Sequence, residues 1–298
     1  MKKSKVINVS NVSGGVGKST TVIELATYFG SKGYHCLVID ADMQASATDC
    51  IGDKGLPIHD KELKTLNKQI EQGNSVLKAL DNCLIESVSS DLSDVMVEPE
   101  IIEEVIQKTE VHNVDLCPSS IRLCQTDKQL TDDITRSAIN RLSIALDIVK
   151  EKYDYILIDN SPAQTLVSTN TLLASDLNII PVKLDRKSLK GMILSLKNTL
   201  SVMKRNRKEI DVKILFTMVA RRGRTEKLMI PWLKEQFGDM ILDTLIPYQK
   251  KPAQDASLKN KQIVWTNTTL GFAYKELGEE LLRVLEGVEN DKAARIIQ

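Results

Sequence analysis

The stretch VINVSNVSGGVGKSTTVIELATYF, residues 6–29, decides how the rest of the chain is interpreted. Residues 6–9 are mostly apolar and β-branched, which is typical of a buried strand. The glycine-rich residues after them cannot continue a strand, and residues 20–29 have a composition compatible with a helix. The order strand, tight loop and helix predicts a loop whose backbone can surround a phosphate group.

The residues of this loop suit a nucleotide. Without Cβ atoms, the glycines let consecutive backbone N–H groups point toward one anion, and the following helix directs the positive end of its dipole there. Lys18 can then reach the outer phosphates and act in catalysis, while the Ser19 hydroxyl can join the coordination shell of Mg²⁺. A glycine turn that binds no nucleotide is the alternative. The predicted nucleotide-binding residues are Gly14, Gly15, Val16, Gly17, Lys18, Ser19 and Thr20.

The loop departs from the strict phosphate-loop pattern, G-x-x-x-x-G-K-[ST], because Val12 occupies its first position. The remaining G-G-x-G-K-S-T-T resembles the deviant Walker A loop of the ParA/MinD class of ATPases. That resemblance implies ATP and Mg²⁺ as cofactors and a homodimer that forms on ATP binding. The class places a second lysine before the glycine pair, to reach the partner's phosphates, but Ser13 stands here. Either dimerisation and basal hydrolysis are weak, or another basic residue enters the site.

Two further segments supply carboxylates. Asp40 and Asp42 follow a short apolar run, and in open α/β sheets ligands bind at the carboxyl ends of the strands. The string DADMQ resembles the family's DxDPQ element, with Met43 in place of proline, and this resemblance implies that Asp40 positions the water that attacks ATP. A second apolar run ends in Asp159, which matches a Walker B acid that holds Mg²⁺ through water. Acids at strand ends also cap helices, which is the structural alternative.

Composition excludes several classes of protein. With 42% hydrophobic and 27% charged residues among 298, the chain has an ordinary globular composition, and no stretch reaches the length of a membrane span. The five cysteines stand singly, so no disulfide scaffold, zinc site or iron–sulfur carrier is indicated, and a cytoplasmic location is expected. A MinD-like positioning ATPase would require a basic amphipathic tail, which the sequence does not show, so no membrane partner is expected.

The alternation of strands and helices predicts an α/β fold, doubly wound, with a mainly parallel sheet flanked by helices. The whole chain, 1–298, is expected to be a single P-loop ATPase domain without an N-terminal helix-turn-helix domain. Residues 52–112 are expected to form a mostly helical inserted region. Beyond it, the pattern predicts a helix over about 132–152 and a strand over 240–246.

The C-terminal part of the sequence carries one binding motif and one expected core helix. The residues from Ile246 onward resemble the family's loop that closes over the adenine, so Pro247 and Tyr248 are predicted to bind the nucleotide. The final helix, 272–285, is expected to place Phe272 on its buried face.

Charge is unevenly distributed although the formal net charge is zero. Residues 81–115 carry ten acidic residues and one lysine, whereas residues 183–227 carry fourteen basic and four acidic residues. The basic segment is therefore predicted to bind double-stranded DNA non-specifically as a group, although a solvated helix face explains any single residue better. The candidate DNA-binding residues are Arg221, Arg222 and Arg224, followed by Lys204, Arg205, Arg207 and Lys208.

The family resemblance extends these expectations to a cellular role. It implies that an ATP-bound dimer on the nucleoid holds DNA, and that a cargo-bound ParB-type adaptor triggers hydrolysis during segregation of plasmid or chromosomal DNA. A scaffold that binds ATP with little turnover is the other interpretation, because Ser13 lacks the charge of the family's lysine.

Overall fold

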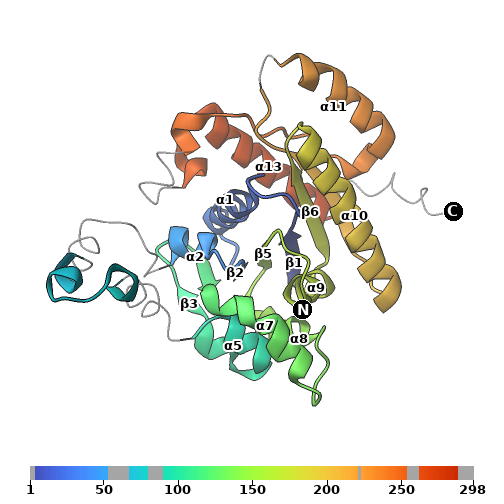
Figure 1. The fold of residues 1–298 in the computed structure, drawn as a ribbon. Helices are drawn as coiled ribbons and strands as arrows, with labels where there is room; N and C mark the ends of the chain where they lie inside the picture. Colours follow the sequence, from blue (N-terminus) through green and yellow to red (C-terminus); the bar gives the residue numbers. More distant parts are fainter. Residues whose placement is uncertain (1–3, 53–66, 80–89, 221–222, 254–261, 288–298) are drawn as a thin grey trace.

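The centre of the molecule is a seven-stranded sheet (Figure 1). The computed structural model describes residues 4–52, 67–79, 90–220, 223–253 and 262–287. The strand order is β3-β4-β2-β5-β1-β6-β7, and every neighbouring pair is parallel except β3 with β4. The strands are β1 (Lys5–Val9), β2 (Cys36–Ala41), β3 (Gln107–Lys108), β4 (Val114–Cys117), β5 (Tyr155–Asn160), β6 (Leu177–Val182) and β7 (Asp211–Phe216).

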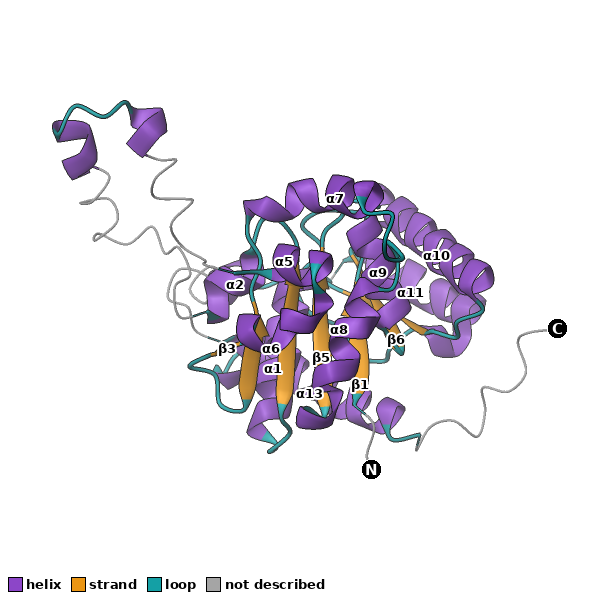
Figure 2. Cartoon of the chain, turned by 90° about the horizontal axis from the view of Figure 1, so that it is seen from below, coloured by secondary structure: helices purple, strands orange, loops and turns teal. Residues whose placement is uncertain are grey.

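Helices cover both faces of the sheet because its central strands are apolar on both sides. In β5, Tyr155 and Leu157 join one buried cluster, while Ile156 and Ile158 join another on the opposite face. The predicted doubly wound fold is thus confirmed (Figure 2). The helices beside Leu157 are α1 (Lys18–Ser31), α2 (Ser46–Ile51) and α13 (Thr269–Leu285). The other face carries α5 (Leu92–Val97), α6 (Ile102–Val105), α7 (Thr126–Asp132), α8 (Arg141–Val149), α9 (Leu166–Ala174), α10 (Arg186–Asn206) and α11 (Arg224–Phe237).

The second half of the expected inserted region belongs to the core. Leu92, Met96 and Ile102, from α5 and the segment after it, are fully buried against β2 and β5. Short helical turns occur at 67–71 and 76–79. Residues 53–66 and 80–89, which the same expectation included, lie outside the described residues.

Three sequence expectations were wrong in detail. The helix predicted over 132–152 begins only at Arg141, in α8, because residues 133–140 form a loop in which Asp133 accepts a hydrogen bond from the backbone N–H of Thr135. The strand predicted over 240–246 makes only isolated bridges with its neighbours, because the carboxylate of Glu280 accepts the backbone N–H groups of Asp243 and Thr244. The final helix buries Leu277 but leaves Phe272 51% exposed.

No helix in the parts of the chain that the structure describes is both long and apolar enough to span a bilayer.

Candidate nucleotide-binding site

The glycine loop connects β1 to α1 at the carboxyl edge of the sheet. Gly15 and Gly17 adopt φ angles of 67° and 88°, a region in which side chains are strained, and α1 begins immediately afterwards with Lys18. The loop is fixed from a second strand, because the Thr217 hydroxyl donates a 2.8 Å hydrogen bond to the carbonyl of Val16. Sequence reasoning had not identified Thr217, which is distant in the chain.

Lys18 lies inside the site rather than in solvent. It is 7% exposed, and its Nζ atom is 3.4 Å from the carbonyl oxygen of Ser13, which accepts its hydrogen bond. Burial lowers the pKa of Lys18, while the negative charges of Asp159 and Asp42 oppose that change. A buried ammonium group beside the glycine loop is suited to a polyanionic ligand, because phosphate oxygens would replace the solvation that burial removes.

Asp159 lies beside Asp40 in the sheet, since the two are register partners in β5 and β2. Neither oxygen of the Asp159 carboxylate has a hydrogen-bond partner among the described residues, although the side chain is fully buried. Burial raises the pKa of Asp159 well above its usual value, and the charge of Asp40 raises it further, whereas Ser19 and Lys18 act in the opposite direction. A buried carboxylate without partners, close to a serine hydroxyl, fits the oxygen ligands that Mg²⁺ prefers.

Asp40 is fully occupied by internal hydrogen bonds. One of its oxygens accepts the backbone N–H and the hydroxyl of Thr48, both at 2.8 Å, and the other accepts the backbone N–H of Asp42 at 3.1 Å. Burial raises the pKa of Asp40 to about 6, although the hydrogen bonds from Thr48 oppose the rise. Asp42, not Asp40, lines the cavity beside the loop. The structure therefore puts the residue predicted to position water behind the site and a different acid in front of it.

A cavity of about 520 Å³ opens in front of the glycine loop. Gly14, Gly15, Gly17, Lys18, Ser19 and Thr20 all line it, so these predicted residues are brought together, while Val16 is buried behind them. A smaller cavity of about 200 Å³ continues past Thr20 to the predicted residues Pro247 and Tyr248. Met218 and Ile263 line both cavities. The two spaces together form an elongated site with a polar end at the loop and an apolar end.

Glu24 is an acidic residue of the site that sequence reasoning missed. It lies on α1, lines the larger cavity, and accepts the backbone N–H groups of Ile263 and Val264 at 2.8 and 2.7 Å. Burial raises the pKa of Glu24 to about 7, although these hydrogen bonds oppose the rise. Glu24 thereby attaches the segment before α13 to the helix that carries the phosphate loop.

Ser13 faces α10 rather than solvent. Its hydroxyl donates a 3.3 Å hydrogen bond to the carbonyl of Lys187, and its backbone N–H donates to the side chain of Asn11 at 2.8 Å. Gly191 of α10 packs so closely that a Cβ atom built on it would lie 2.1 Å from the Ser13 oxygen. The small side chain at position 13 therefore allows α10 to approach the loop.

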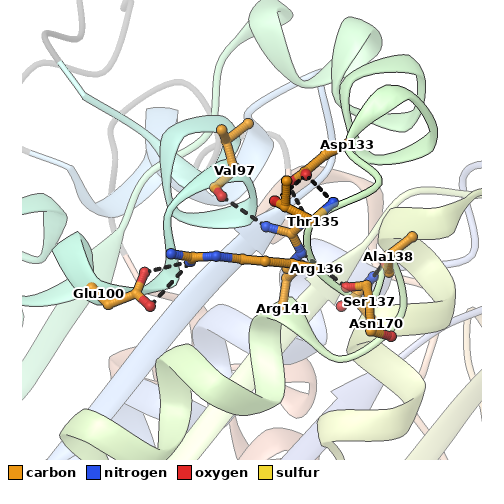
Figure 3. A network of polar contacts seen from close by, with 9 residues as sticks. All are labelled: Val97, Glu100, Asp133, Thr135, Arg136, Ser137, Ala138, Arg141 and Asn170. Atoms are coloured by element: carbon orange, nitrogen blue, oxygen red, sulfur yellow. Dashed lines mark hydrogen bonds and ion pairs between the residues drawn. The ribbon is translucent and has the colours of Figure 1, made fainter.

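The segment after Asp159 is supported by a polar network on the other face of the sheet. The carboxylate of Asp127 accepts the backbone N–H groups of Leu166 and Val167, at the start of α9. Behind α7, the fully buried Arg141 donates to Asp133 and to the carbonyls of Val97 and Ser137 (Figure 3). Asn170 of α9 joins the same loop by donating to the carbonyl of Ala138. This network fixes the loop between α7 and α8 against α9.

Those predicted DNA-binding residues that the structure describes do not form one cluster. Arg224 is exposed at the start of α11, which follows β7 at the carboxyl edge of the sheet. Lys204, Arg205 and Arg207 are exposed at the far end of α10, which has 21 residues and is therefore about 30 Å long. Lys208 is half-buried beside them. Arg221 and Arg222 lie outside the described residues.

The mainly parallel sheet and the glycine loop between β1 and α1 together define a P-loop nucleoside triphosphatase fold. The family model described as an AAA domain matches residues 4–213, and the chain belongs to that family. Soj, the sporulation initiation inhibitor protein of Bacillus subtilis, is 28% identical over 93% of this chain and 98% of its own. The chromosome partitioning protein ParA of Myxococcus xanthus is 25% identical over 94% of this chain and 88% of its own. Within the family, the chain is of the ParA type.

Comparison with solved structures agrees on the fold. Cobyrinic acid a,c-diamide synthase from Mycobacterium smegmatis, solved with an ATP analogue and magnesium, has a TM-score of 0.72. The match covers 96% of this chain and 97% of that one, at 19% identity. This similarity shows the fold, and the sequence relatives show a ParA-family partition or positioning ATPase.

Proposed function

We propose that this protein binds ATP with Mg²⁺ and hydrolyses it slowly. The observation that carries the proposal is the meeting, at one sheet edge, of the glycine loop, the buried Lys18 and the carboxylate of Asp159, which has no hydrogen-bond partner among the described residues. Lys18 would contact the outer phosphates, and Ser19 and Asp159 would hold the metal ion, which neutralises phosphate charge when bound. The apolar end of the cavity, near Pro247 and Tyr248, would hold the base.

In this proposal, Asp42 positions the attacking water and Asp40 positions Asp42. Asp42 lines the cavity, and its backbone N–H donates to Asp40, which is anchored to Thr48. From the sequence, the water-positioning role was expected for Asp40, and the hydrolysis rates of Asp40 and Asp42 variants distinguish the two assignments. Asp42 borders the cavity and is within reach of a water bound there, whereas Asp40 already accepts three hydrogen bonds from Thr48 and Asp42.

At the cellular level, we propose that an ATP-bound dimer on the nucleoid binds DNA non-specifically. With a cargo-bound adaptor of the ParB type, it would segregate plasmid or chromosomal DNA in the cytoplasm, and the chain would act as a single ATPase domain. The similarity to Soj and ParA supports this role, as does the basic segment from 183 to 227.

The proposal is tested by titrating the protein with a fluorescent ATP analogue and, separately, with a labelled DNA duplex. The Lys18→Ala variant is expected to bind nucleotide about 10- to 100-fold more weakly, because a charged contact to phosphate is lost. The matched control is Lys128→Ala, which removes an exposed lysine from α7. DNA binding by the wild-type protein is expected only with ATP.

Two results would contradict the proposal. Unchanged nucleotide affinity in a folded Lys18→Ala variant rejects the nucleotide site. Equal DNA affinity with and without ATP leaves the nucleotide site intact but rejects an ATP-dependent DNA-binding dimer.

A further inference from the structure

The outer face of α10 has an uncommon composition. The helix contains six lysines and arginines and no acidic residue. Three of the lysines recur every seven residues and form one exposed row along the helix: Lys190, Lys197 and Lys204. Three partly exposed apolar side chains flank this row. Ile193 is 47% exposed, Leu194 is 42% exposed and Leu200 is 51% exposed. We name this set the α10 outer face.

No described part of the chain covers this face. Met192 and Leu196 pack against β6 and β7, so the helix is already attached to the sheet by its other side. In both views α10 lies at the outside of the molecule (Figures 1 and 2). None of the three lysines in the row forms an ion pair with a described residue. Three half-exposed aliphatic side chains thus lie beside cations that form no ion pair with a described residue, a combination suited to a partner that is both apolar and acidic.

The buried side of the same helix contacts the phosphate loop. Ser195 accepts a hydrogen bond from the backbone N–H of Val12 at 3.1 Å, and the carbonyl of Lys187 accepts one from the Ser13 hydroxyl. Thr199 accepts a hydrogen bond from Asn178, which is linked to Asn8 of β1. A partner on the α10 outer face would therefore lie one helix diameter, about 10 Å, from the nucleotide loop.

We propose that the α10 outer face binds an acidic amphipathic helix of another protein. Glutamates spaced one heptad apart would pair with the lysine row, and leucines between them would cover Ile193 and Leu200. This goes beyond the proposed function and does not depend on nucleotide.

Three other occupants fit the face less well. A second copy of this chain would set one lysine row against another, which repels. DNA would pair with the lysines, and Lys204 at the end of the row is also a candidate DNA contact, but DNA would leave Ile193 and Leu200 in water. A membrane-bound helix keeps its cations at the sides of an apolar centre, whereas here the lysines run along the middle of the exposed face.

The test uses a labelled 21-residue helical peptide with leucine and glutamate in heptad register, and measures binding by fluorescence anisotropy. The wild-type protein is expected to bind it, and a scrambled peptide of equal composition is expected to bind at least about tenfold more weakly. The double variant Ile193→Ser/Leu200→Ser is expected to weaken binding by about tenfold or more, because it removes the apolar contacts. Ile144→Ser/Ile148→Ser is the matched control, since these isoleucines of α8 are 37% and 40% exposed.

A charge exchange separates binding from a structural role. The Lys190→Glu/Lys197→Glu variant is expected to lose its affinity for the glutamate peptide. It is expected to bind instead a peptide in which lysines replace the glutamates. Circular dichroism and thermal unfolding establish that each variant is folded. Lys18→Ala should bind the glutamate peptide like the wild type, so failure of the nucleotide site and failure of this surface give different results.

Several outcomes would overturn the proposal. Equal binding of the scrambled peptide, or no effect of Ile193→Ser/Leu200→Ser, would mean unspecific attraction of charge. Binding to phosphatidylglycerol vesicles but not to the peptide would identify a lipid surface. A dimer that sedimentation detects in the wild type without nucleotide, and that Ile193→Ser/Leu200→Ser abolishes, would identify a second copy as the occupant.

Discussion

At the scale of single residues, the acids at the ends of β2 and β5 have different surroundings within one small volume. Asp40 receives three hydrogen bonds, Asp159 receives none from the described residues, and Asp42 borders the cavity. These surroundings suit the three different roles proposed above for side chains of the same type: Asp40 would order the loop, Asp159 would hold a metal ion, and Asp42 would position the attacking water.

The roles of Asp40 and Asp42 can be separated by hydrolysis rates. Asp42→Ala is expected to bind ATP but to turn it over about 10²- to 10⁴-fold more slowly, the range for loss of acid–base assistance. Asp40→Asn keeps an oxygen that can accept from Thr48, and is expected to lose less activity. Single-turnover hydrolysis with measured ATP affinity gives both quantities. If Asp40→Asn is the slower enzyme, the assignment is reversed.

Glu24 gives a prediction about pH. The pKa of Glu24 is about 7 in the folded protein and 4.5 in the unfolded chain. At pH values between these two, the folded protein therefore holds a proton that the unfolded chain has lost. The free energy of unfolding therefore falls as pH rises from 4.5 to 7, by up to about 3 kcal/mol from this group. Glu24→Gln cannot titrate, so urea unfolding should show a smaller fall over this range.

The control for this measurement is Glu104→Gln, because Glu104 is exposed on α6. Asp40 and Asp159 also have raised pKa values and remain in every variant, so the informative quantity is the difference from wild type. An identical pH dependence in wild type and Glu24→Gln would show that Glu24 does not titrate in this range.

At the scale of elements, β1, the glycine loop and α1 could be predicted because each is specified by its own residues. Apolar β-branched residues form the strand, and glycines are needed where φ is positive. The loop that separates α7 from α8 depends both on the local turn at Asp133 and on contacts between distant residues. Asp133 pairs with Arg141, which reaches the carbonyl of Val97 in α5. Glu24, whose partners are Ile263 and Val264, was missed for the same reason.

The packing of α10 on the phosphate loop changes the expected effect of a lysine at position 13. From the sequence alone, Ser13→Lys restores the family's lysine and strengthens an ATP-dependent dimer. In the structure Ser13 is buried against Gly191, so a lysine must displace α10. We therefore expect Ser13→Lys to lower the free energy of unfolding by about 1–3 kcal/mol. Ser13→Ala, the control, should cost less than about 1 kcal/mol, as urea unfolding would measure.

Light scattering with a slowly hydrolysed ATP analogue then tests the dimer itself. A folded Ser13→Lys variant of wild-type stability that dimerises more strongly would restore the interpretation from the sequence. Wild-type protein that is already dimeric under ATP would instead favour a substitute cation.

At the scale of the whole molecule, the basic residues are divided between two edges of the sheet. Arg224 lies at the carboxyl edge, and Lys204 and Arg205 lie at the other end of α10. Sequence proximity had suggested one surface, but helices that cross the sheet carry neighbouring segments to opposite edges. The number of basic residues could be obtained from the sequence, whereas the distribution of these residues in space could not.

Salt dependence of DNA binding can locate the contact. Each phosphate contact contributes about −0.9 to the slope of log affinity against log salt. Arg224→Ala should flatten the slope by about 0.9 if DNA lies at the carboxyl edge, and Lys204→Ala/Arg205→Ala by about twice that if it lies at the far end. Lys128→Ala is the control. Unchanged slopes in both variants would move the DNA surface elsewhere.

The central position of β1 has a consequence for how the protein is made. β1 pairs with β5 and β6. Val9 therefore has strand partners on both sides only after Asp159 and Ile179 have been synthesised. During translation the glycine loop therefore emerges early but has no sheet edge to attach to until most of the chain has left the ribosome. A chaperone that holds exposed apolar strands would find β1 available for that whole interval. The residues that line the nucleotide cavity extend to Ile263, so the complete cavity can form only after the chain has been synthesised beyond that residue.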